Sequence, residues 1–412
     1  MQYSETVEIN GHLMDTGILS RVLDDIREYD GDYVIDRFDV GHDAGDTSHA
    51  QITVSASDDE GLQRLLMRLQ TRGVNQVDPG EAAVLPAEMD GVFPDGFYSS
   101  TNLVTRVRLA GKWIEVENPE MDCGLIVRDH NGVTSVSTLP MADVKAGMQV
   151  ICGASGIKVT VPVSTRESGG FGFMESDVSS EKPQAVLVRQ VAQGMRDAKE
   201  AGKKVLWVGG PGVVHTGAAP AMVELIKAGY VDVLFAGNAL ATHDIESSLY
   251  GTSLGIDLAM GQGVEHGHEH HIRAINTIRK AGSIRDAVAS GVLTGGIMHQ
   301  LVKQEKTFVL VGSVRDDGPL PDVYTDVIEG QRAMRAELTD VGFCLMVATM
   351  LHSVATGNIL PASIPLVCVD INPATVTKLA DRGSSQARGI VTDVGLFLEQ
   401  LAGELVPSYR RA

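Results

Sequence analysis

The sequence has few cysteines and a deficit of basic residues, and each scarcity excludes a class of protein. The four cysteines among 412 residues show no C-x-x-C spacing, which argues against a zinc ribbon or a disulfide framework and fits a reducing cytoplasm. The 34 basic residues are outnumbered by 53 acidic ones, giving a net charge of −19. Binding to a nucleic-acid backbone through bulk charge is therefore not expected, because neutralising phosphates requires clustered Lys and Arg.

Long apolar runs are also missing. The most apolar segment, FCLMVATML at 343–351, has about half the length that a membrane helix needs. The first residues, MQYSETVEINGHLMD, lack the basic region and apolar stretch of a signal peptide. We therefore predict a soluble, cytoplasmic protein without a membrane partner.

The pattern of apolar residues divides the chain into three predicted domains. Residues 1–80 follow the order β-α-β-β-α, which predicts a small ferredoxin-like α+β domain. Residues 81–183 predict a β-rich domain of three hairpins, turning at Ala-Gly, His-Asn-Gly and Ala-Ser-Gly, followed by a polar linker. Residues 184–412 alternate short apolar strands with helices, which predicts a doubly wound, Rossmann-like parallel sheet. The predicted fold class is α/β.

Polar residues and glycines follow nearly every strand predicted for residues 184–412. Because ligands of open parallel sheets bind beyond the carboxyl ends of the strands, these loops predict a ligand site, although turn chemistry alone is the alternative. In chain order they are Gly209, Gly210, Pro211, Gly212, His215, Thr216 and Gly217; Gly237, Asn238, Thr242, His243 and Asp244; Gly312, Ser313, Arg315, Asp316, Asp317 and Gly318; and Asp370, Asn372, Thr392 and Asp393.

The first of these loops, GGPGVVHTGA, indicates a nucleotide. Its glycines let the backbone approach a pyrophosphate, and a following helix would offer free N–H groups. The signal is weak, because His215 stands where the third glycine of the dinucleotide motif belongs. The second strand ends in Asn238 instead of the acidic residue that holds a ribose, so Asp370 is a substitute candidate. We predict a nucleotide held in a variant manner.

Two further segments carry chemically versatile side chains. In SVRDDGPLPD at 313–322, Arg315 offers a planar fork for a carboxylate, and Asp316 or Asp317 can bind an ammonium group or move a proton. The alternative for this segment is a salt-bridged turn. GVEHGHEHH at 263–271 is rich in histidine but lacks the H-E-x-x-H spacing of a zinc site. It fits the lining of a site or a solvated loop better, and we predict no metal.

Seven stretches together resemble, in order and spacing, the family named for a region found with lysine-oxoglutarate reductase/saccharopine dehydrogenase. Its members are similar to the ornithine cyclodeaminase half of bifunctional arginine dihydrolase–ornithine cyclodeaminases and also stand alone in archaea. The likeness covers roughly residues 5–400. The stretches are VEINGHLMDTGILSRVLDDI, FPDGFYSSTNL, EMDCGLIV, GPGVVHTGA, FAGNALATHDIESSLYGTSLG, GSVRDDGPLPDV and DINPATVTKLADRGS.

This resemblance implies an NAD-dependent ornithine cyclodeaminase, an ammonia-lyase that makes L-proline and ammonia from L-ornithine. NAD⁺ would take a hydride from Cα, the δ-amine would close the ring as ammonia leaves, and the hydride would return. Activity on arginine is not expected, whereas a homo-oligomer is.

On this hypothesis the predicted site residues take three roles. Those holding NAD are Gly210, Pro211, Gly212, His215, Thr216, Gly217, Asn238, Ser313, Asp370 and Asn372. Arg315 and Asn102 would bind the substrate. Proton transfer would fall to Asp316, Asp317, His243 or Asp244.

Two other functions fit the same loops. An NAD-dependent amino-acid dehydrogenase, of the saccharopine- or lysine-related kind, would release NADH and an oxo acid. A non-catalytic sensor of NAD or an amino acid would bind without turnover, with the ferredoxin-like domain as its regulatory module.

Overall fold

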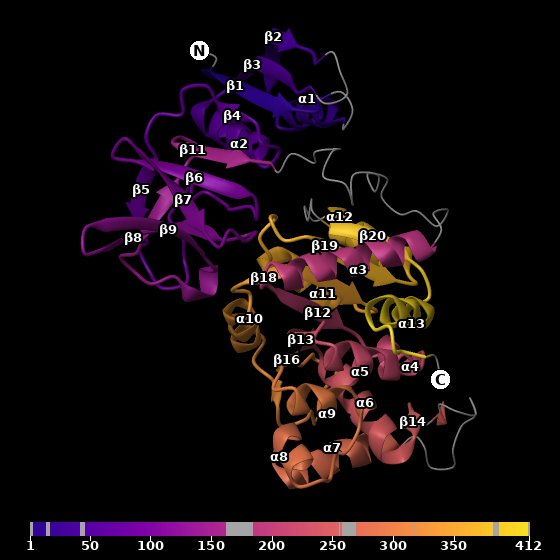
Figure 1. Cartoon of the computed structure of the whole chain (residues 1–412). Coiled ribbons are helices and arrows are strands. Elements are labelled where there is room, and N and C mark those ends of the chain that lie inside the picture. Colours follow the sequence, from indigo (N-terminus) through magenta and orange to yellow (C-terminus); the bar gives the residue numbers. More distant parts are fainter. Residues whose placement is uncertain are drawn as a thin grey trace. The chain divides into compact units, whose positions relative to one another are not determined.

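The computed structural model describes residues 3–13, 17–41, 46–161, 184–254, 256–257, 269–316, 318–381 and 387–410. The chain forms two compact units (Figure 1). The first comprises Met1–Gly172 with Asn358–Ser363, and the second comprises Phe173–Gly357 with Ile364–Ala412.

The first unit begins with the predicted ferredoxin-like arrangement. Its elements are β1 (Tyr3–Gly11), α1 (Ile18–Glu28), β2 (Asp32–Asp39), β3 (Ser48–Ala56), α2 (Asp59–Gln70) and β4 (Asn75–Gln76), and the sheet order is β2-β3-β1-β4. Alternate residues of β3 are buried, so one face of the sheet packs on apolar residues of both helices. The Asp58 side chain caps α2 by accepting from the N–H of Gly61 at 2.7 Å.

A second, seven-stranded sheet completes the first unit. Its strands are β5 (Ala83–Pro86), β6 (Val104–Leu109), β7 (Lys112–Glu117), β8 (Gly124–His130), β9 (Val133–Leu139), β10 (Gln149–Cys152) and β11 (Ile157–Thr160), with a 3₁₀ turn η1 (Met141–Asp143). The hairpins β6–β7 and β8–β9 are confirmed.

The third predicted hairpin, β10–β11, is wrong. β10 pairs with β5 and β8, whereas β11 pairs with β6 at the opposite edge of the sheet. The connection turns through Gly153 and Gly156, which have φ values of 70° and 67°. Gly156 also packs against the backbone of Ala82, because a Cβ added at Gly156 would lie 2.1 Å from the amide nitrogen of Ala82. This long-range contact directs the chain away from β10, and the local Ala-Ser-Gly pattern carries no sign of it.

The second unit contains the predicted doubly wound sheet. Its strands are β12 (Lys204–Gly209), β13 (Val233–Ala236), β16 (Thr307–Val311), β17 (Val323–Tyr324), β18 (Val341–Val347), β19 (Leu366–Asp370) and β20 (Ala387–Val391). They are parallel and lie in the order β17-β16-β13-β12-β18-β19-β20. The order reverses at β12, so the switch point, where ligands of such sheets bind, lies between β12 and β18.

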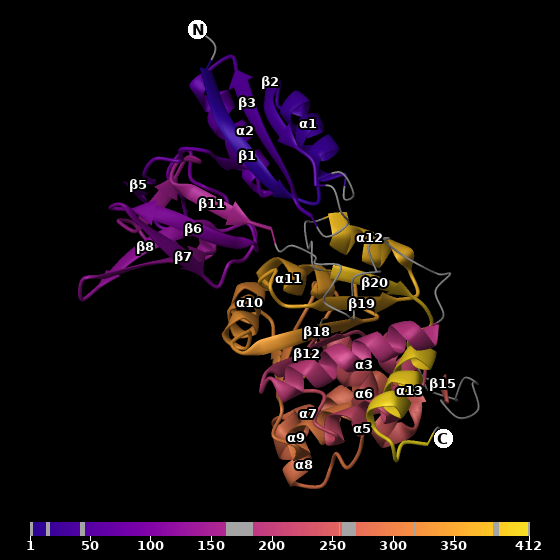
Figure 2. The ribbon, with the colours of Figure 1, turned by 45° about the horizontal axis from the view of Figure 1, so that its top comes forward.

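Helices pack around this sheet and account for most of the remaining chain. They are α3 (Gln184–Glu200), α4 (Gly212–His215), α5 (Ala219–Lys227), α6 (Asn238–Tyr250), α7 (His270–Ala281), α8 (Ile284–Ala289), α9 (Gly296–Lys303), α10 (Val327–Ala336), α11 (Leu351–Ile359), α12 (Pro373–Asp381) and α13 (Val394–Leu405), with the short hairpin β14 (Thr252–Ser253) and β15 (Ile256–Asp257). Among them α13 packs against α3 and α5 (Figure 2). In the described part of the chain no helix has the length and apolar character to cross a membrane.

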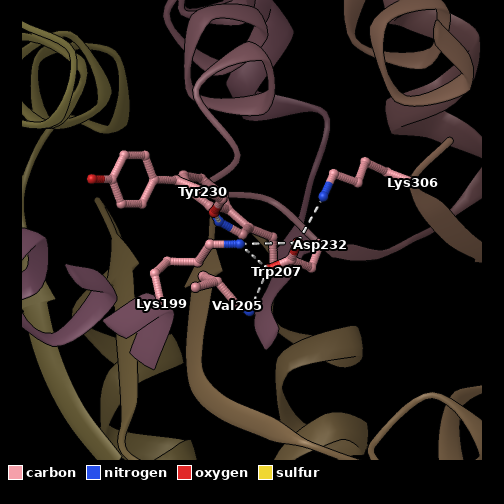
Figure 3. A network of polar contacts seen from close by, with 6 residues as sticks. All are labelled: Lys199, Val205, Trp207, Tyr230, Asp232 and Lys306. Carbon is pink, nitrogen blue, oxygen red and sulfur yellow. Dashed lines mark hydrogen bonds and ion pairs between the residues drawn. The ribbon is translucent and has the colours of Figure 1, made fainter. Parts of the chain in front are cut away.

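A network of hydrogen bonds and ion pairs connects the segment before β13 with the start of β12 and with two lysines (Figure 3). The Asp232 carboxylate accepts from Lys306 Nζ at 2.7 Å, from Lys199 Nζ at 3.2 Å and from the N–H of Val205 at 3.0 Å. Burial alone would raise the pKa of Asp232, but these hydrogen bonds and the two lysine charges lower it below its ordinary value. The network lies at the amino ends of the strands, away from the edge at which ligands bind.

Candidate active site

The glycine loop after β12 lies at the switch point of the parallel sheet. The N–H of Gly210 donates to the carbonyl oxygen of Val347, the last residue of β18, at 2.9 Å. A Cβ added at Gly210 would lie 1.8 Å from the carbonyl oxygen of Ala348, so the close approach of the two loops requires glycine here. Gly212 is similarly close, because its added Cβ would lie 2.9 Å from the Cβ of Ala348.

The rest of this loop folds back on itself. Pro211 precedes the short helix α4, and Thr216 Oγ1 donates to the carbonyl oxygen of Gly212 at 2.8 Å. Gly217 has a φ of 78°, a conformation that side chains disfavour. The predicted loop residues are therefore neighbours in space as well as in sequence.

The side-chain oxygen of Asn238, which opens α6 after β13, accepts two hydrogen bonds within the protein. Its Oδ1 accepts from the N–H of Leu320 at 3.0 Å and from Thr242 Oγ1 at 3.2 Å. Its Nδ2 donates one hydrogen to Asp316 Oδ1 at 3.4 Å, and its second hydrogen has no partner among the described residues. Asn238 therefore contacts Asp316 and keeps one N–H donor but no unbonded acceptor.

The turn after β16 carries Ser313, Arg315 and Asp316. Asp316 Oδ2 accepts from the N–H of Ser313 at 2.9 Å, and Ser313 Oγ accepts from the N–H of Arg315 at 3.3 Å. The Arg315 side chain is exposed, and within the described part of the chain its guanidinium forms no ion pair. Asp317 lies outside the described residues.

A histidine that the sequence analysis missed faces this turn. The ring of His352, on α11, lies beside Gly237, whose added Cβ would be 3.2 Å from Cε1. Burial lowers the pKa of His352, although the carbonyl of Val311 and the charge of Asp316 oppose the shift. It escaped notice because it lies five residues beyond the end of β18, outside the positions directly after a strand.

A second group of polar side chains lies along α4, α6 and the hairpin β14–β15. We call it the histidine cluster, and its members are His215, His243, Glu246, Thr252, Ser253 and His270. His243 Nδ1 lies 2.9 Å from Glu246 Oε2, and the rings of His215 and His243 are 4.8 Å apart. His215 Nδ1 in turn lies 2.7 Å from Ser253 Oγ.

Glu246 lies at the centre of the histidine cluster and is completely buried. Its Oε1 accepts from Thr252 Oγ1 at 2.9 Å, and that hydroxyl lies 2.8 Å from His270 Nδ1. Burial and the neighbouring His243 lower the pKa of His215, while Glu246 opposes the shift. Glu246 was missed in the sequence, where its i, i+3 spacing from His243 on one helix face was the available signal.

Asp244, a predicted proton-transfer residue, caps a helix. It is buried, and its two oxygens accept from the N–H groups of Ile297 and Met298 at 2.7 and 2.8 Å at the start of α9. Burial raises the pKa of Asp244 to about 6, with both backbone hydrogen bonds opposing the shift. The geometry gives this carboxylate a structural role.

Asp370 and Asn372 follow β19. Asp370 Oδ1 accepts from the N–H of Asn372 at 2.8 Å, and its Oδ2 forms no hydrogen bond with a described residue. Asn372 Oδ1 accepts from the N–H of Ala374 at 3.0 Å, which caps α12. Asp370 thus keeps one carboxylate oxygen for a ligand, whereas Asn372 acts on the helix end.

Asn102 belongs to the first unit, where it is buried. Its Nδ2 donates to the carbonyl oxygen of Leu360 at 3.2 Å, and the backbone carbonyl oxygen of Asn102 accepts from the N–H of Ala362 at 2.8 Å. Asn102 therefore anchors the segment Asn358–Ser363 within that unit.

The described residues include no group of three or more His, Cys, Asp or Glu side chains arranged to hold a metal ion. Glu265, His266 and His268 of the histidine-rich segment lie outside the described residues.

The parallel sheet and the glycine loop at its switch point define a Rossmann-fold protein. Three family models together span most of the chain. Residues 189–401 match the C-terminal Rossmann fold of arginine dihydrolase ArgZ-like proteins, residues 104–188 match the first region of that C-terminal part, and residues 4–103 match the LOR/SDH bifunctional enzyme conserved region. The chain belongs to this LOR/SDH and ArgZ-like family.

Individual relatives agree with this assignment. The chain is 51% identical to an ornithine cyclodeaminase of Methanothermobacter thermautotrophicus, over 97% of both proteins. It is 43% identical to the bifunctional arginine dihydrolase/ornithine cyclodeaminase AgrE of a Nostoc species, covering 98% of this chain and 58% of AgrE.

Solved structures of the bifunctional relatives are similar as well. The cyanobacterial ArgZ apo structure has a TM-score of 0.85 at 35% identity, over 98% of this chain and 58% of ArgZ. A ternary complex of AgrE with ornithine and NAD⁺ has a TM-score of 0.53 at 42% identity, over 98% of this chain and 58% of AgrE.

Proposed function

We propose that this protein is an NAD-dependent ornithine cyclodeaminase that converts L-ornithine into L-proline and ammonia. The observation that carries the proposal is the match, over nearly the full length of both chains, to relatives named ornithine cyclodeaminase at 44–51% identity. The glycine loop at the switch point of the Rossmann sheet supports the cofactor, and AgrE binds ornithine with NAD⁺.

The residues at the carboxyl edge of the sheet fit NAD. Glycine at 210 and 212 lets this loop pack closely against the loop after β18. The N–H of Gly212 forms no hydrogen bond within the described residues and is suited to donate to a pyrophosphate. The unbonded Oδ2 of Asp370 is suited to accept from a ribose hydroxyl. NAD bound there would supply a hydride acceptor that later becomes the hydride donor.

The hydrogen bonds of Asn238 favour a particular placement of the adenosine ribose. A ribose at the end of β13 would find the Asn238 oxygen already accepting from Leu320 and Thr242, with one Nδ2 hydrogen on Asp316. Asp370, at the end of β19, offers the carboxylate instead. We therefore assign the ribose to the β18–β19 side of the switch point, and the substrate to the side of Asp316 and the histidine cluster.

Arg315 and Asp316 then suit the charges of ornithine. The exposed Arg315 guanidinium, unpaired within the described residues, can form a bidentate contact with the substrate carboxylate. Asp316, fixed by Ser313 and Asn238, presents a negative charge for an ammonium group. Asn102 remains a proposed substrate contact from the first unit.

Incubation with L-ornithine and NAD⁺ tests the function directly. Proline and ammonia in equal amounts with no net NADH support cyclodeamination. NADH that accumulates with ornithine supports an amino-acid dehydrogenase, and binding without turnover supports a sensor.

We also propose a cytoplasmic homo-oligomer acting in ornithine catabolism and proline formation. All four cysteines are buried, and a sequence with so few of them fits a reducing compartment. The edge strand β2 exposes Val34 and Ile35, apolar side chains that a second copy could cover. Light scattering after size-exclusion chromatography tests the oligomer, because it gives the mass in solution.

A further inference from the structure

The histidine cluster contains a carboxylate and an imidazole arranged as a catalytic dyad. An ionised Glu246 can only accept, so the 2.9 Å contact with His243 Nδ1 places the proton on that nitrogen. The Nε2 of neutral His243 then carries a lone pair, and it forms no hydrogen bond with a described residue. A buried carboxylate that orients an imidazole in this way is the arrangement that prepares histidine for proton abstraction.

The remaining contacts of Glu246 hold it in place. Thr252 uses its single hydroxyl hydrogen on Glu246 Oε1, so the same hydroxyl oxygen must accept from His270 Nδ1. The N–H of Leu254 also approaches Glu246 Oε2, at 3.3 Å. Donors from β14 and the residue after it therefore fix a carboxylate that has no exposure to water, and His270 of α7 in turn holds Thr252.

The other sequence-predicted proton acceptors are less suited to this work. Both oxygens of Asp244 are occupied by the N–H groups that begin α9. The two oxygens of Asp316 accept from Asn238 and Ser313, which suits a fixed charge better than a proton shuttle. Asp317 lies outside the described residues, and among the described candidates His243 combines a held orientation with an open acceptor atom.

We propose that Glu246 is a positioning residue that holds His243 as the general base of the site, with Nε2 as the atom that takes the proton. The inference rests on the proposed function and deepens it. An N–H bond of a substrate ammonium group breaks, an Nε2–H bond forms, and the Glu246 carboxylate stabilises the imidazolium. The proton later passes to the departing ammonia, so that the dyad ends each turnover unchanged.

The titratable groups around His243 come from three elements. Glu246 on the same helix contacts its Nδ1 at 2.9 Å, and the ring of His215 from α4 lies 4.8 Å away. His271 from α7 lies further off, at 6.4 Å between rings, and His270 acts through Thr252. Glu246 has the most direct contact of these groups, so its replacement is the sharpest test.

The test compares Glu246→Gln with Glu246→Asp and with Glu60→Gln, a matched change on the exposed face of α2. We expect Glu246→Gln to lower kcat at least tenfold, a part of the roughly 10²–10⁴-fold that a general base contributes. Its NAD affinity and its KM for ornithine should stay near wild type. Glu246→Asp, which keeps the carboxylate, should restore most of the lost kcat.

Several results would overturn the inference. One is a kcat for Glu246→Gln within twofold of wild type, and another is a loss of kcat that Glu246→Asp does not restore, which indicates a structural role only. If Glu246→Gln fails to fold, His243→Gln decides, because removing the proposed base must lower kcat at least tenfold while NAD affinity stays near wild type. Wild type that forms no proline refutes the proposed function and this inference with it. Wild type that turns over while Glu246→Gln behaves like Glu60→Gln refutes the inference alone.

Discussion

A single methyl group added at residue 210 tests the geometry of the switch point. The Cβ of Gly210→Ala would lie 1.8 Å from the carbonyl oxygen of Ala348, where an ordinary C···O contact is about 3.3 Å, so one loop must move by about 1.5 Å. The obstructing atoms are backbone and cannot rotate aside. Ala348 itself has a φ of 55°, a left-handed conformation that already costs about 1 kcal/mol. The loop after β18 therefore has little freedom to yield.

The expected loss of stability for Gly210→Ala is about 1–3 kcal/mol, the usual cost of overpacking. Because the displaced loop carries the amides proposed to face the pyrophosphate, NAD affinity should fall about tenfold or more, equivalent to about 1.4 kcal/mol. Urea unfolding and titration calorimetry measure the two effects. The matched control is Gly403→Ala on α13, where an added Cβ meets nothing within 4 Å and should stabilise the helix by about 0.5–1 kcal/mol. An unfolding free energy for Gly210→Ala within about 0.5 kcal/mol of wild type, with unchanged NAD affinity, refutes the reasoning.

The remaining predictions concern three carboxylate or guanidinium groups. The pKa of Asp244 is raised to about 6, so the folded protein binds the carboxyl proton more tightly than the unfolded chain does. The stability that the protonated carboxyl adds is complete below about pH 4 and is lost as the pH rises through 6. Asp244→Asn should remove that dependence in urea unfolding between pH 5 and 8, and an unchanged slope contradicts the assignment. The pKa of Asp232 is lowered in the folded protein. The stability that the ionised carboxylate adds is therefore present above the pKa of the unfolded chain and is lost as the pH falls through the pKa of the folded protein. Asp232→Asn should lower the free energy of unfolding by on the order of 2 kcal/mol, a cost between those of exposed and buried ion pairs. The kcat should be unchanged, and a catalytic defect in the folded variant would contradict this purely structural role. Arg315→Ala should raise the KM for ornithine about 10- to 100-fold in steady-state assays, because a charged hydrogen bond to the substrate carboxylate is lost. Arg315→Lys should have an intermediate KM. An unaltered KM rules out the proposed contact between Arg315 and the carboxylate.

Local patterns were sufficient for most of the fold. The strands of the parallel sheet are buried along nearly their whole length, so each appears in the sequence as a continuous apolar run. β3 alternates between buried and partly exposed residues because one of its faces is covered. β4 and β17 have two residues each and show no such pattern, since their pairing is set by neighbouring strands. The β10–β11 error has the same origin, because a distant contact at Gly156 decides the direction of the chain.

The site was less predictable because loops reveal residue types but not bonding partners. Reading the positions after each strand selected Asp316, Asp370 and Asn238, but it could not reveal that the Asn238 oxygen accepts from Leu320 and Thr242. It also selected Asp244, whose partners at the start of α9 are more than fifty residues away in sequence. His352 was missed for the opposite reason, because it reaches the site from within a helix that begins beyond the strand end.

The polar residues of α6 can be distinguished only by their hydrogen-bond partners. It is buried along most of its length, including Asn238, Thr242, His243, Asp244 and Glu246, so it shows almost no amphipathic pattern. A polar group buried without a partner costs about 1–3 kcal/mol, and a helix with this many survives only if nearly all are bonded. Asn238, Thr242 and Asp244 meet that demand through bonds within the protein. His243 differs from these three, because its Nδ1 is bonded to Glu246 while its Nε2 has no partner among the described residues. An acceptor atom without a partner among the described residues, on a helix whose other polar side chains are bonded within the protein, is available to a ligand, and this is why we assign the proton chemistry to His243 and not to its neighbour Asp244.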